Sequence, residues 1–362
     1  MSAAAEPARP AVVSAAPSTL TSRLQAQSDQ CALHGSPLTA ALLSGAARDL
    51  AAGGVVAELL GRHAHEPAGS VPSLRLAGAL HRLVLERRAP ALALHYPSVG
   101  GTAPVLELWP AARNAIEEHL EALRELVARP VQTNEVGRSA ALYGGLLHIS
   151  GAAGLPVRLL EVGASAGLNL RVDRFAYRIA GQVLGDPGSP VLLEEPWRGR
   201  HPVGELQVVD RAGCDPAPLD PLTTDGRLTL TSYVWGDQLA RLERLRGALQ
   251  VAADVPAGLE RAPASAFLRR ELAEPRLGVA TVVWHSVVRQ YMTPTERAKV
   301  DVLLAASGAR ATRTAPLYRL SMEPERTDGD SYAFRLELTS WPGGQVEVLA
   351  DCQGHGPPVR WR

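Results

Sequence analysis

The sequence predicts an α/β fold in which an all-helical N-terminal region precedes a mostly parallel, doubly wound sheet that ends in an antiparallel hairpin. Helical periodicity and helix caps dominate the chain from about residue 21 to residue 156. From Val157 onward, short apolar runs typical of buried strands alternate with helical segments. The last two expected strands, 333–338 and 345–349, are joined across Pro342-Gly343-Gly344, which favours a closing hairpin.

This pattern divides the 362 residues into three expected parts. Residues 1–20 are rich in Ala, Pro and Ser, and we expect a disordered leader there. Residues 21–156 are expected to form a helical domain or cap, and residues 157–362 an α/β domain. The leader has no basic head followed by an apolar run, and no stretch approaches the ~18 uninterrupted apolar residues of a membrane helix. We therefore expect a cytoplasmic protein.

The composition narrows the class of ligand. Lys+Arg and Asp+Glu are each 37, so the formal net charge is zero, and aromatic residues make up only 4% of the chain. The chain therefore lacks the basic field and the stacking rings that favour nucleic acid or an anionic membrane. Cys31, Cys214 and Cys352 lie far apart, which argues against a disulfide framework and a zinc site. We expect a small-molecule ligand and no metal.

Helix signals in the N-terminal region are clearest at Ser36-Pro37, an N-cap followed by proline at the first helical position. That helix is expected to close at Gly53-Gly54. Apolar residues at helical spacing predict further helices over 74–87 and 111–128. Another helix is expected over 134–149.

Strands and helices alternate in the second half of the chain. Val157–Glu161 is expected to be a strand, and the turn Gly163–Gly167 to lead directly into a helix. An irregular stretch containing a hairpin follows over 177–202. The other expected elements are strands over 205–210, 227–233, 278–284 and 317–322 and helices over 237–249 and 293–308.

The turn after the first expected strand carries the clearest chemical signal. Its sequence, Glu161-Val-Gly163-Ala-Ser165-Ala-Gly167, resembles motif I of the class I S-adenosylmethionine-dependent methyltransferases, which are Rossmann-like. By this resemblance Gly163, Ser165 and Gly167 form the loop under the methionine part of the cofactor. Glu161 lies beside the cofactor's amino group, and Asn169 belongs to the same site. The position of Ser165 is usually glycine in that superfamily.

The same turn also fits a G-x-S-x-G nucleophile elbow, which would make Ser165 the nucleophile of a serine hydrolase. Asp301 or Asp351, followed by His355, would then complete the order Ser…acid…His. An elbow normally follows several strands, whereas only helices are expected before Val157. The position of the turn therefore favours cofactor binding over hydrolysis.

Acidic residues after the next strands are the second requirement of a methyltransferase site. Asp210 and Asp215 are the candidates for holding the ribose hydroxyls, and the sequence does not decide between them. The acid that commonly contacts the adenine has no counterpart near Pro263. That departure leaves a third interpretation, a non-catalytic binding protein on a methyltransferase-like fold.

Catalytic and cleft residues are expected where strands and helices meet the ligand crevice. His285 ends the strand 278–284, at the carboxyl edge that faces ligands in such sheets, and is the candidate general base. Gln290 follows it toward the same crevice. Asn134, Glu135 and Arg138 begin a helix that would cover the sheet edge and bring them into the cleft.

Several motifs together resemble the uncharacterised bacterial family called domain of unknown function 2332. They are Val131–Arg138, Glu161–Leu170, His95–Ser98, Ser232–Gln238 and Val283–Val287. The resemblance covers nearly the whole chain after the leader, and it implies this domain layout but no particular reaction. The leading hypothesis from the sequence is therefore an S-adenosylmethionine-dependent methyltransferase that acts on a small molecule.

Overall fold

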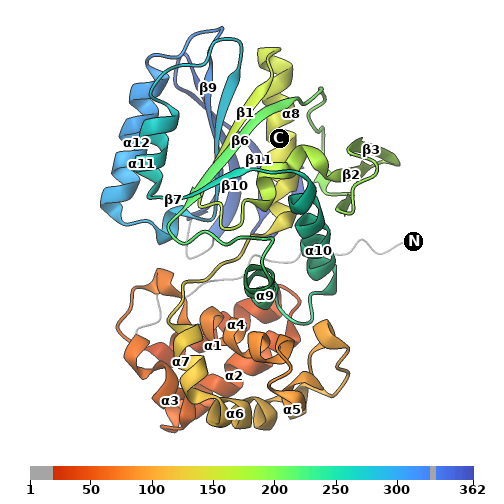
Figure 1. Ribbon diagram of the computed structural model, residues 1–362, viewed down its shortest axis with the longest axis vertical. Coiled ribbons are helices and arrows are strands. Elements are labelled where there is room, and N and C mark those ends of the chain that lie inside the picture. Colours follow the sequence, from red (N-terminus) through yellow and green to blue (C-terminus); the bar gives the residue numbers. More distant parts are fainter. Residues whose placement is uncertain (1–18, 327–331) are drawn as a thin grey trace, which may run out of the picture.

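The computed structural model describes residues 19–326 and 332–362, which form two bodies (Figure 1). One body consists of helices, and the other is built on a sheet of nine strands. The expected leader, residues 1–20, lies outside the described residues except at its end, where Thr19 caps the first helix. An α/β fold with a large, mostly parallel sheet and an all-helical N-terminal region is thus confirmed.

The N-terminal helices begin where their caps predict. The Ser36 hydroxyl accepts a hydrogen bond from the backbone N–H of Thr39, and Pro37 is the first residue of α2. The helix expected over 111–128 is instead two helices that meet at His119. The helices before the first strand are α1 (Leu20–Leu33), α2 (Pro37–Ala51), α3 (Val55–Leu60), α4 (Pro72–Leu85), α5 (Pro90–Ala93), α6 (Leu108–Glu118), α7 (Leu120–Val127) and α8 (Ser139–Ala153), with 3-10 helices at Gly61–His63, Ala68–Ser70, Pro97–Val99, Val105–Glu107 and Val136–Arg138 (η5).

The large sheet has the strand order β5-β12-β11-β10-β9-β8-β1-β6-β7. Neighbouring strands from β7 through β9 are parallel, whereas β9, β10, β11 and β12 are antiparallel neighbours. The expected closing hairpin is therefore part of a four-stranded meander, whose last strand the sequence analysis missed. The strands are β1 (Val157–Val162), β5 (Trp197–Arg198), β6 (Val208–Asp215), β7 (Gly258–Arg261), β8 (Ala280–Ser286), β9 (Leu317–Arg326), β10 (Tyr332–Trp341), β11 (Gln345–Gln353) and β12 (Gly356–Trp361).

The hairpin expected within 177–202 is β2 (Ala176–Ile179) with β3 (Gln182–Gly185), in a small sheet that also holds β4 (Leu192–Glu194). The remaining elements join the strands of the large sheet. They are η6 (Leu168–Arg174), α9 (Thr224–Ser232), α10 (Leu239–Asp254), α11 (Ala264–Glu271), η7 (Arg289–Tyr291) and α12 (Pro294–Gly308).

Helices cover both faces of the large sheet (Figure 1). Helices α8 and α10 share a core with one face, which includes Leu159 of β1 and Trp284 of β8. Helices α11 and α12 share a second core with the other face, which includes Leu160 and Val283. Successive strand residues point to opposite faces, so a strand covered on both sides must be apolar nearly throughout. This explains the continuous apolar runs of β1 and β8.

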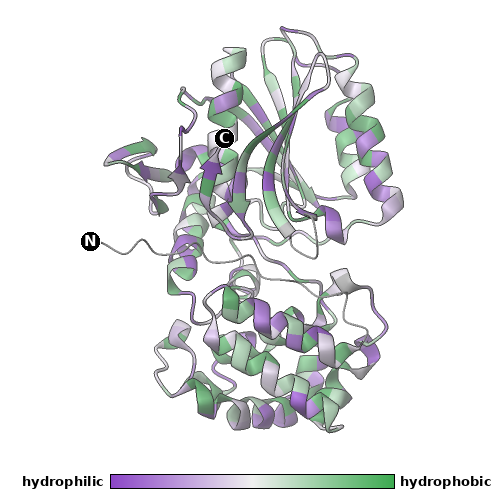
Figure 2. Cartoon of the chain, turned by 180° about the vertical axis from the view of Figure 1, so that it is seen from behind, coloured by the Kyte–Doolittle hydropathy of each residue, from purple (hydrophilic) through white to green (hydrophobic). Residues whose placement is uncertain are grey.

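Figure 2 shows hydrophobic and hydrophilic residues alternating along the helices of both bodies. Such helices bury one side against a core and expose the other. Among the described helices, none alone has the length and apolar composition to cross a membrane; only α2 taken together with Val55–His63, at a bend of 90°, meets those two criteria.

Two segments differ from the expected secondary structure. Residues 227–233, expected to be a strand, lie in α9 and at its end. Their alternation of leucine with polar residues favours a strand, but Thr223 caps a helix there, and Arg82 of α4 binds Asp225 and Thr229. The helix expected from Asn134 begins at Ser139, after a short 3-10 turn. Tertiary contacts thus outweigh local propensity at α9.

The two bodies are not separated at residue 156, where the sequence predicts the boundary between the domains. Helix α8 precedes that point but belongs to the core of the sheet. Helix α9 follows it but packs against α4 of the helical body. Asp237, the first residue of the helix expected over 237–249, accepts hydrogen bonds from Ser36 Oγ (2.6 Å) and Leu38 N (2.9 Å) at the start of α2. The helical body is therefore completed by residues from the second half of the chain.

Candidate functional site

A cavity of about 2180 Å³ lies between the helical body and the carboxyl ends of the parallel strands. The chain order of the sheet reverses beside β1, because β6 and β7 lie on one side of it and β8 and β9 on the other. Ligands of open α/β sheets bind in the crevice outside such a reversal. The cavity wall contains the last residues of β1, β6 and β8, among them Glu161, Asp215 and His285.

The turn after β1 has a backbone that glycine accommodates best. Gly163 and Gly167 have φ of +72° and +64°, and Ser165 has φ of +53°. A Cβ atom on Gly163 would lie 2.3 Å from Cγ2 of Val288, so the loop after β8 also needs glycine there. Two independent constraints, a left-handed backbone and a close neighbour, therefore act on Gly163.

The backbone N–H groups of this turn are already bonded within the protein. Gly163 and Ala164 both donate to the carbonyl of Cys214, and Ser165 donates to Asp215 Oδ2. The turn then enters η6, a seven-residue 3-10 helix, instead of the expected α-helix. The turn therefore does not lead into an α-helix N-terminus, the element that forms an anion cradle in many phosphate-binding folds.

Glu161, the predicted partner of the cofactor's amino group, is buried and lines the cavity. Burial raises the pKa of Glu161 to about 8, although the nearby charge of Arg171 opposes the shift. Its Oε2 atom has no hydrogen bond within the described part of the chain, although the indole N–H of Trp284, itself unbonded there, is near enough to lower the pKa of Glu161. The buried Oδ1 of Asn169 also has no partner in the described residues. Two acceptor oxygens in the cavity wall thus make no hydrogen bond within the described ranges.

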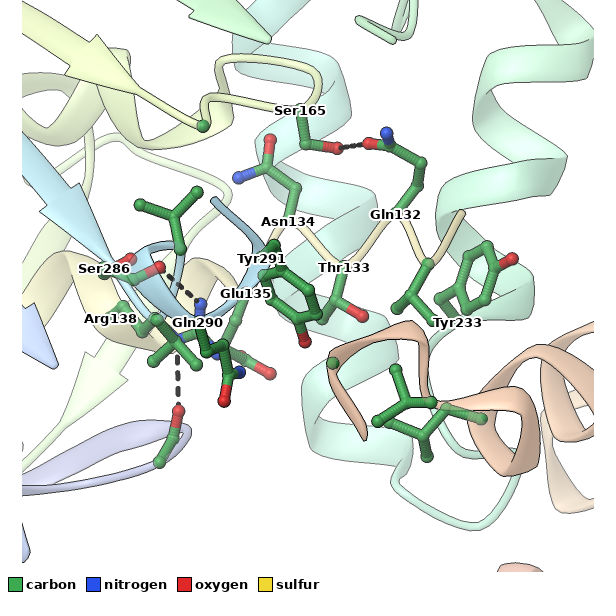
Figure 3. Close-up of a pocket in the computed structure, with 18 of the residues that line it drawn as sticks. Gln132, Thr133, Asn134, Glu135, Arg138, Ser165, Tyr233, Ser286, Gln290 and Tyr291 are labelled. Carbon is green, nitrogen blue, oxygen red and sulfur yellow. Dashed lines mark hydrogen bonds between the residues drawn. The ribbon is translucent and has the colours of Figure 1, made fainter. Parts of the chain in front are cut away.

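The segment Val131–Arg138, which we call the strap, crosses this turn (Figure 3). Gln132 Oε1 accepts a 2.6 Å hydrogen bond from Ser165 Oγ, and Gln132 Nε2 donates to the carbonyl of Ala217. Asn134 Oδ1 accepts from the backbone N–H of Leu168 at 2.9 Å. The strap therefore fixes the turn from the cavity side. Sequence reasoning did not select Gln132 as a site residue, and its position within the Val131–Arg138 motif was the only available signal.

Glu135 of the strap is the centre of a buried polar cluster in the cavity wall. Its Oε2 atom lies 2.6 Å from Arg241 Nη2 and 3.3 Å from His355 Nδ1. Burial alone would raise the pKa of Glu135, but the charges of Arg241, His355 and Arg138 outweigh it and hold the pKa below its usual value. The Arg241 guanidinium also lies 5.3 Å from the centre of a Trp235 ring. Glu135 is therefore a charged anchor at this junction.

Arg138 ends the strap and reaches the ends of β8 and β11. Its Nη1 donates to the carbonyl of Ser286, and its Nε donates to that of Gly354 (Figure 3). Burial lowers the pKa of Arg138, which Glu135 partly offsets. Gln290 lies opposite in η7, with Tyr291 beside it, and both side chains are exposed at the cavity. The structure thus brings together the expected cleft residues, Asn134, Glu135, Arg138 and Gln290. The first three lie on the strap, which precedes α8, and not in the helix expected over 134–149.

His285, the candidate general base, ends β8 with its side chain 4% exposed. Its Nδ1 atom lies 2.8 Å from Oε1 of Glu323, a residue that sequence reasoning did not select. Its Nε2 atom is buried and has no partner among the described residues. A signal was available, because the strand after His285 was expected over 317–322 and ends beside an acid.

The two candidate ribose acids lie at opposite ends of β6. Asp210 is outside the cavity wall and pairs with Arg158 (3.1 Å) and Arg276 (2.8 Å). Asp215 ends the strand in the cavity wall, where it accepts hydrogen bonds from Ser165 N and Ala217 N. Of the two, only Asp215 is placed to reach a ligand in the cavity.

The residues that would form the Ser–acid–His triad of a hydrolase contact other groups and not one another. Ser165 Oγ donates to a glutamine, and His355 lies against Glu135. Asp301 makes a bidentate pair with Arg289, and Asp351 pairs with Arg362. Histidine therefore makes no hydrogen bond with Ser165 in the described residues.

The segment after β7 is where a methyltransferase commonly has the acid that contacts the adenine. Ala262, Pro263 and Ala264 line the cavity without an acid of their own. Ser265 donates to Glu296 of α12 through its N–H and its hydroxyl, at 2.8 and 3.0 Å. An acid thus does approach this strand end, but it comes from α12 and is engaged by Ser265.

The comparisons with known proteins identify the family. Residues 21–361 match the family described as an uncharacterized protein conserved in bacteria, domain of unknown function 2332. The chain belongs to this family. The match spans both bodies and every segment that forms the cavity wall. Neither the curated proteins nor the solved structures include a match to the chain. No group of three or more His, Cys, Asp or Glu side chains suited to a metal ion occurs within residues 19–326 and 332–362.

Proposed function

We propose that this family member is an S-adenosylmethionine-dependent methyltransferase that acts on a small molecule. The observation that carries the proposal is Glu161, a buried carboxylate with an unpartnered oxygen at the carboxyl end of β1, in the wall of a large cavity. A hydrogen-bond donor would satisfy this oxygen, and a donor with a positive charge, such as an ammonium group, would in addition favour the ionised form of Glu161. The amino group of a bound S-adenosylmethionine would be such a donor.

The strand order supports the finer fold assignment. Taken in chain order, the parallel strands β1, β6, β7, β8 and β9 occupy the sheet as 3-2-1-4-5. This is the arrangement of the doubly wound dinucleotide-binding folds, in which the cofactor lies across the first strand. We therefore assign the α/β body to the Rossmann-like class, with the antiparallel meander replacing the usual last strand.

The residues present fit the cofactor at three points. Glu161 offers a carboxylate for the amino group, Asp215 offers one at the end of the second strand for hydroxyl groups, and Gly163 keeps the turn free of a side chain. When bound, S-adenosylmethionine would supply an electrophilic methyl group carried on a positively charged sulfur.

The chain's own residues would bind and orient the reactants and exclude water. The helical body lies across the cavity from the strand ends and would shield the reacting groups from part of the solvent. His285 would receive the acceptor's proton. Holding two reactants in one orientation is itself worth several kcal/mol of the barrier.

Isothermal titration calorimetry with S-adenosylmethionine and S-adenosylhomocysteine tests the proposal. We expect saturable binding near one molecule per chain. Glu161→Gln should weaken it by about 10- to 100-fold, the value of a charge-assisted hydrogen bond. Asp210→Asn is the matched control and should bind as the wild type does, because Asp210 lies outside the cavity wall.

Two other outcomes would point to the alternatives. Absence of binding by a folded protein would overturn the methyltransferase and favour a non-catalytic binding protein. Labelling of Ser165 by a serine-directed phosphonate, lost in Ser165→Ala together with esterase activity, would establish the hydrolase. The Gln132 contact of Ser165 leads us to expect no labelling.

A further inference from the structure

We propose that Glu323 is the positioning residue of a Glu323–His285 pair in which His285 Nε2 takes a proton from a bound ligand. The proposal rests on the proposed function only in naming that ligand as the methyl acceptor. It assigns the acceptor to groups that must lose a proton on methylation, such as a hydroxyl or an N–H group, because an ionised carboxylate or a thioether has no proton to give.

The geometry fixes which ring nitrogen carries the hydrogen. Strands β8 and β9 are parallel, with His285 opposite Ser321, so Glu323 lies two residues further along β9, beyond the end of β8. Glu323 Oε1 lies 2.8 Å from His285 Nδ1. An ionised carboxylate can only accept hydrogen bonds, so Nδ1 is the donor in this contact, and in the neutral ring Nε2 then keeps its lone pair.

Glu323 is itself held in place. Its Oε1 atom also accepts from the backbone N–H of Val288 at 3.1 Å, in the loop that follows β8. Its Oε2 atom is buried without a partner in the described residues. The carboxylate is therefore fixed by the same loop that contacts Gly163.

A free Nε2 atom does not by itself distinguish His285, because His63 of the helical body also has Nδ1 on a glutamate and Nε2 without a partner in the described residues. His285 differs in lining the cavity, which His63 does not. His81, buried in the helical body, uses both ring nitrogens, with Nδ1 at 3.2 Å from the carbonyl of Ser232 and Nε2 at 2.8 Å from Ser98 Oγ. A buried polar atom left without a partner costs stability. His285 leaves Nε2 unpaired in a cavity wall, where the donor hydrogen of a ligand would satisfy it.

The other charged groups near His285 are already engaged. Asp301 of α12 pairs with Arg289 of η7, and Arg138 of the strap donates to two backbone carbonyls. Glu323 is therefore the carboxylate that contacts the ring. In the proton transfer the acceptor's O–H or N–H bond breaks, its electron pair stays on the acceptor, and an Nε2–H bond forms. The imidazolium cation is then stabilised by Glu323.

Nitrogen-15 NMR of the whole protein, labelled at histidine, tests the pair without any substrate. At a pH where the ring is neutral, we expect a single tautomer with hydrogen on Nδ1 of His285. Glu323→Ala should lose that single-tautomer pattern. Glu325→Gln is the matched control, because Glu325 lies two residues further on the same strand and pairs with Arg335. It should leave the His285 signals unchanged.

The exposed His65 provides an internal reference in the same spectra, and its signals should be the same in the wild type and in every variant. Glu323→Gln provides a second variant if the alanine variant unfolds. Hydrogen on Nε2 of the neutral His285 ring in the wild type, or a His285 tautomer that is the same in the wild type and in both Glu323 variants, would overturn the proposal. Cofactor titration is a separate measurement, so failure of the methyltransferase assignment and failure of the Glu323–His285 pair are distinguishable.

Discussion

Replacing Glu161 with glutamine should stabilise the free protein at neutral pH, because burial makes the ionised carboxylate costly. The pKa of Glu161 is raised from 4.5 to about 8 in the folded protein. Between these values the folded state holds a proton that the unfolded state has released, so the free energy of unfolding falls as pH rises. The slope approaches about 1.4 kcal/mol per pH unit, and the accumulated cost at pH 7 is about 3 kcal/mol.

Urea denaturation followed by tryptophan fluorescence at pH 5, 6, 7 and 8 measures this cost. We expect Glu161→Gln to match the wild type near pH 4.5 and to exceed it increasingly up to pH 8, above which the difference becomes constant. Glu125→Gln, on an exposed face of α7, should show no such trend. A glutamine variant that is less stable at pH 7, or a difference that does not change with pH, would refute the reasoning.

The same carboxyl group links ligand binding to proton release. A cationic ligand that contacts Glu161 favours its ionised form, so binding at pH 7 should release about 0.9 proton. Calorimetric titration with S-adenosylmethionine in buffers of different ionisation enthalpy measures this number. The release should disappear in Glu161→Gln. Binding without proton release would place the ligand's ammonium group elsewhere.

Three further substitutions test the packing around the site by urea denaturation. Gly163→Ala should lower the free energy of unfolding by about 2–4 kcal/mol, since it adds a clash to a left-handed backbone. The control Gly181→Ala, at φ +82° with open space around it, should lower it by only about 1 kcal/mol. Equal losses in the two variants would exclude the clash. Asp237→Ala should cost about 1–2 kcal/mol by uncapping α2, and an unchanged midpoint would mean that the cap contributes nothing. Arg241→Met should cost about 3–5 kcal/mol by leaving Glu135 charged and buried, and a loss below about 1 kcal/mol would contradict the ion-pair argument.

Local sequence signals correctly predicted the elements that depend only on neighbouring residues in the chain. Ser36-Pro37 marked the start of α2, and the continuous apolar run of β8 marked a strand covered on both faces. Prediction failed where neighbours distant in sequence decide the structure. Residues 227–233 alternate like a strand, yet α4 provides the surface on which they form a helix.

The candidate site shows the same limit. The turn and His285 were selected because they follow strands directly, and strand ends are a local feature. Glu323 depends on the register between β8 and β9, and Gln132 on the path of the strap across the turn. Neither is a property of a short sequence window. The choice between Asp210 and Asp215 likewise required the true end of β6, which lies five residues beyond the expected one.

The helical body is completed by residues that follow the first strands of the sheet in the sequence, and this affects folding during synthesis. The helical body needs α9 to cover α4 and Asp237 to cap α2. A ribosome makes those residues only after β1, the turn and β6 have emerged. The first seven helices, which end at Val127, therefore keep part of their apolar surface uncovered while about a third of the chain is translated. We expect limited proteolysis of nascent chains to show protection of the helical body only once residues beyond 238 have left the exit tunnel.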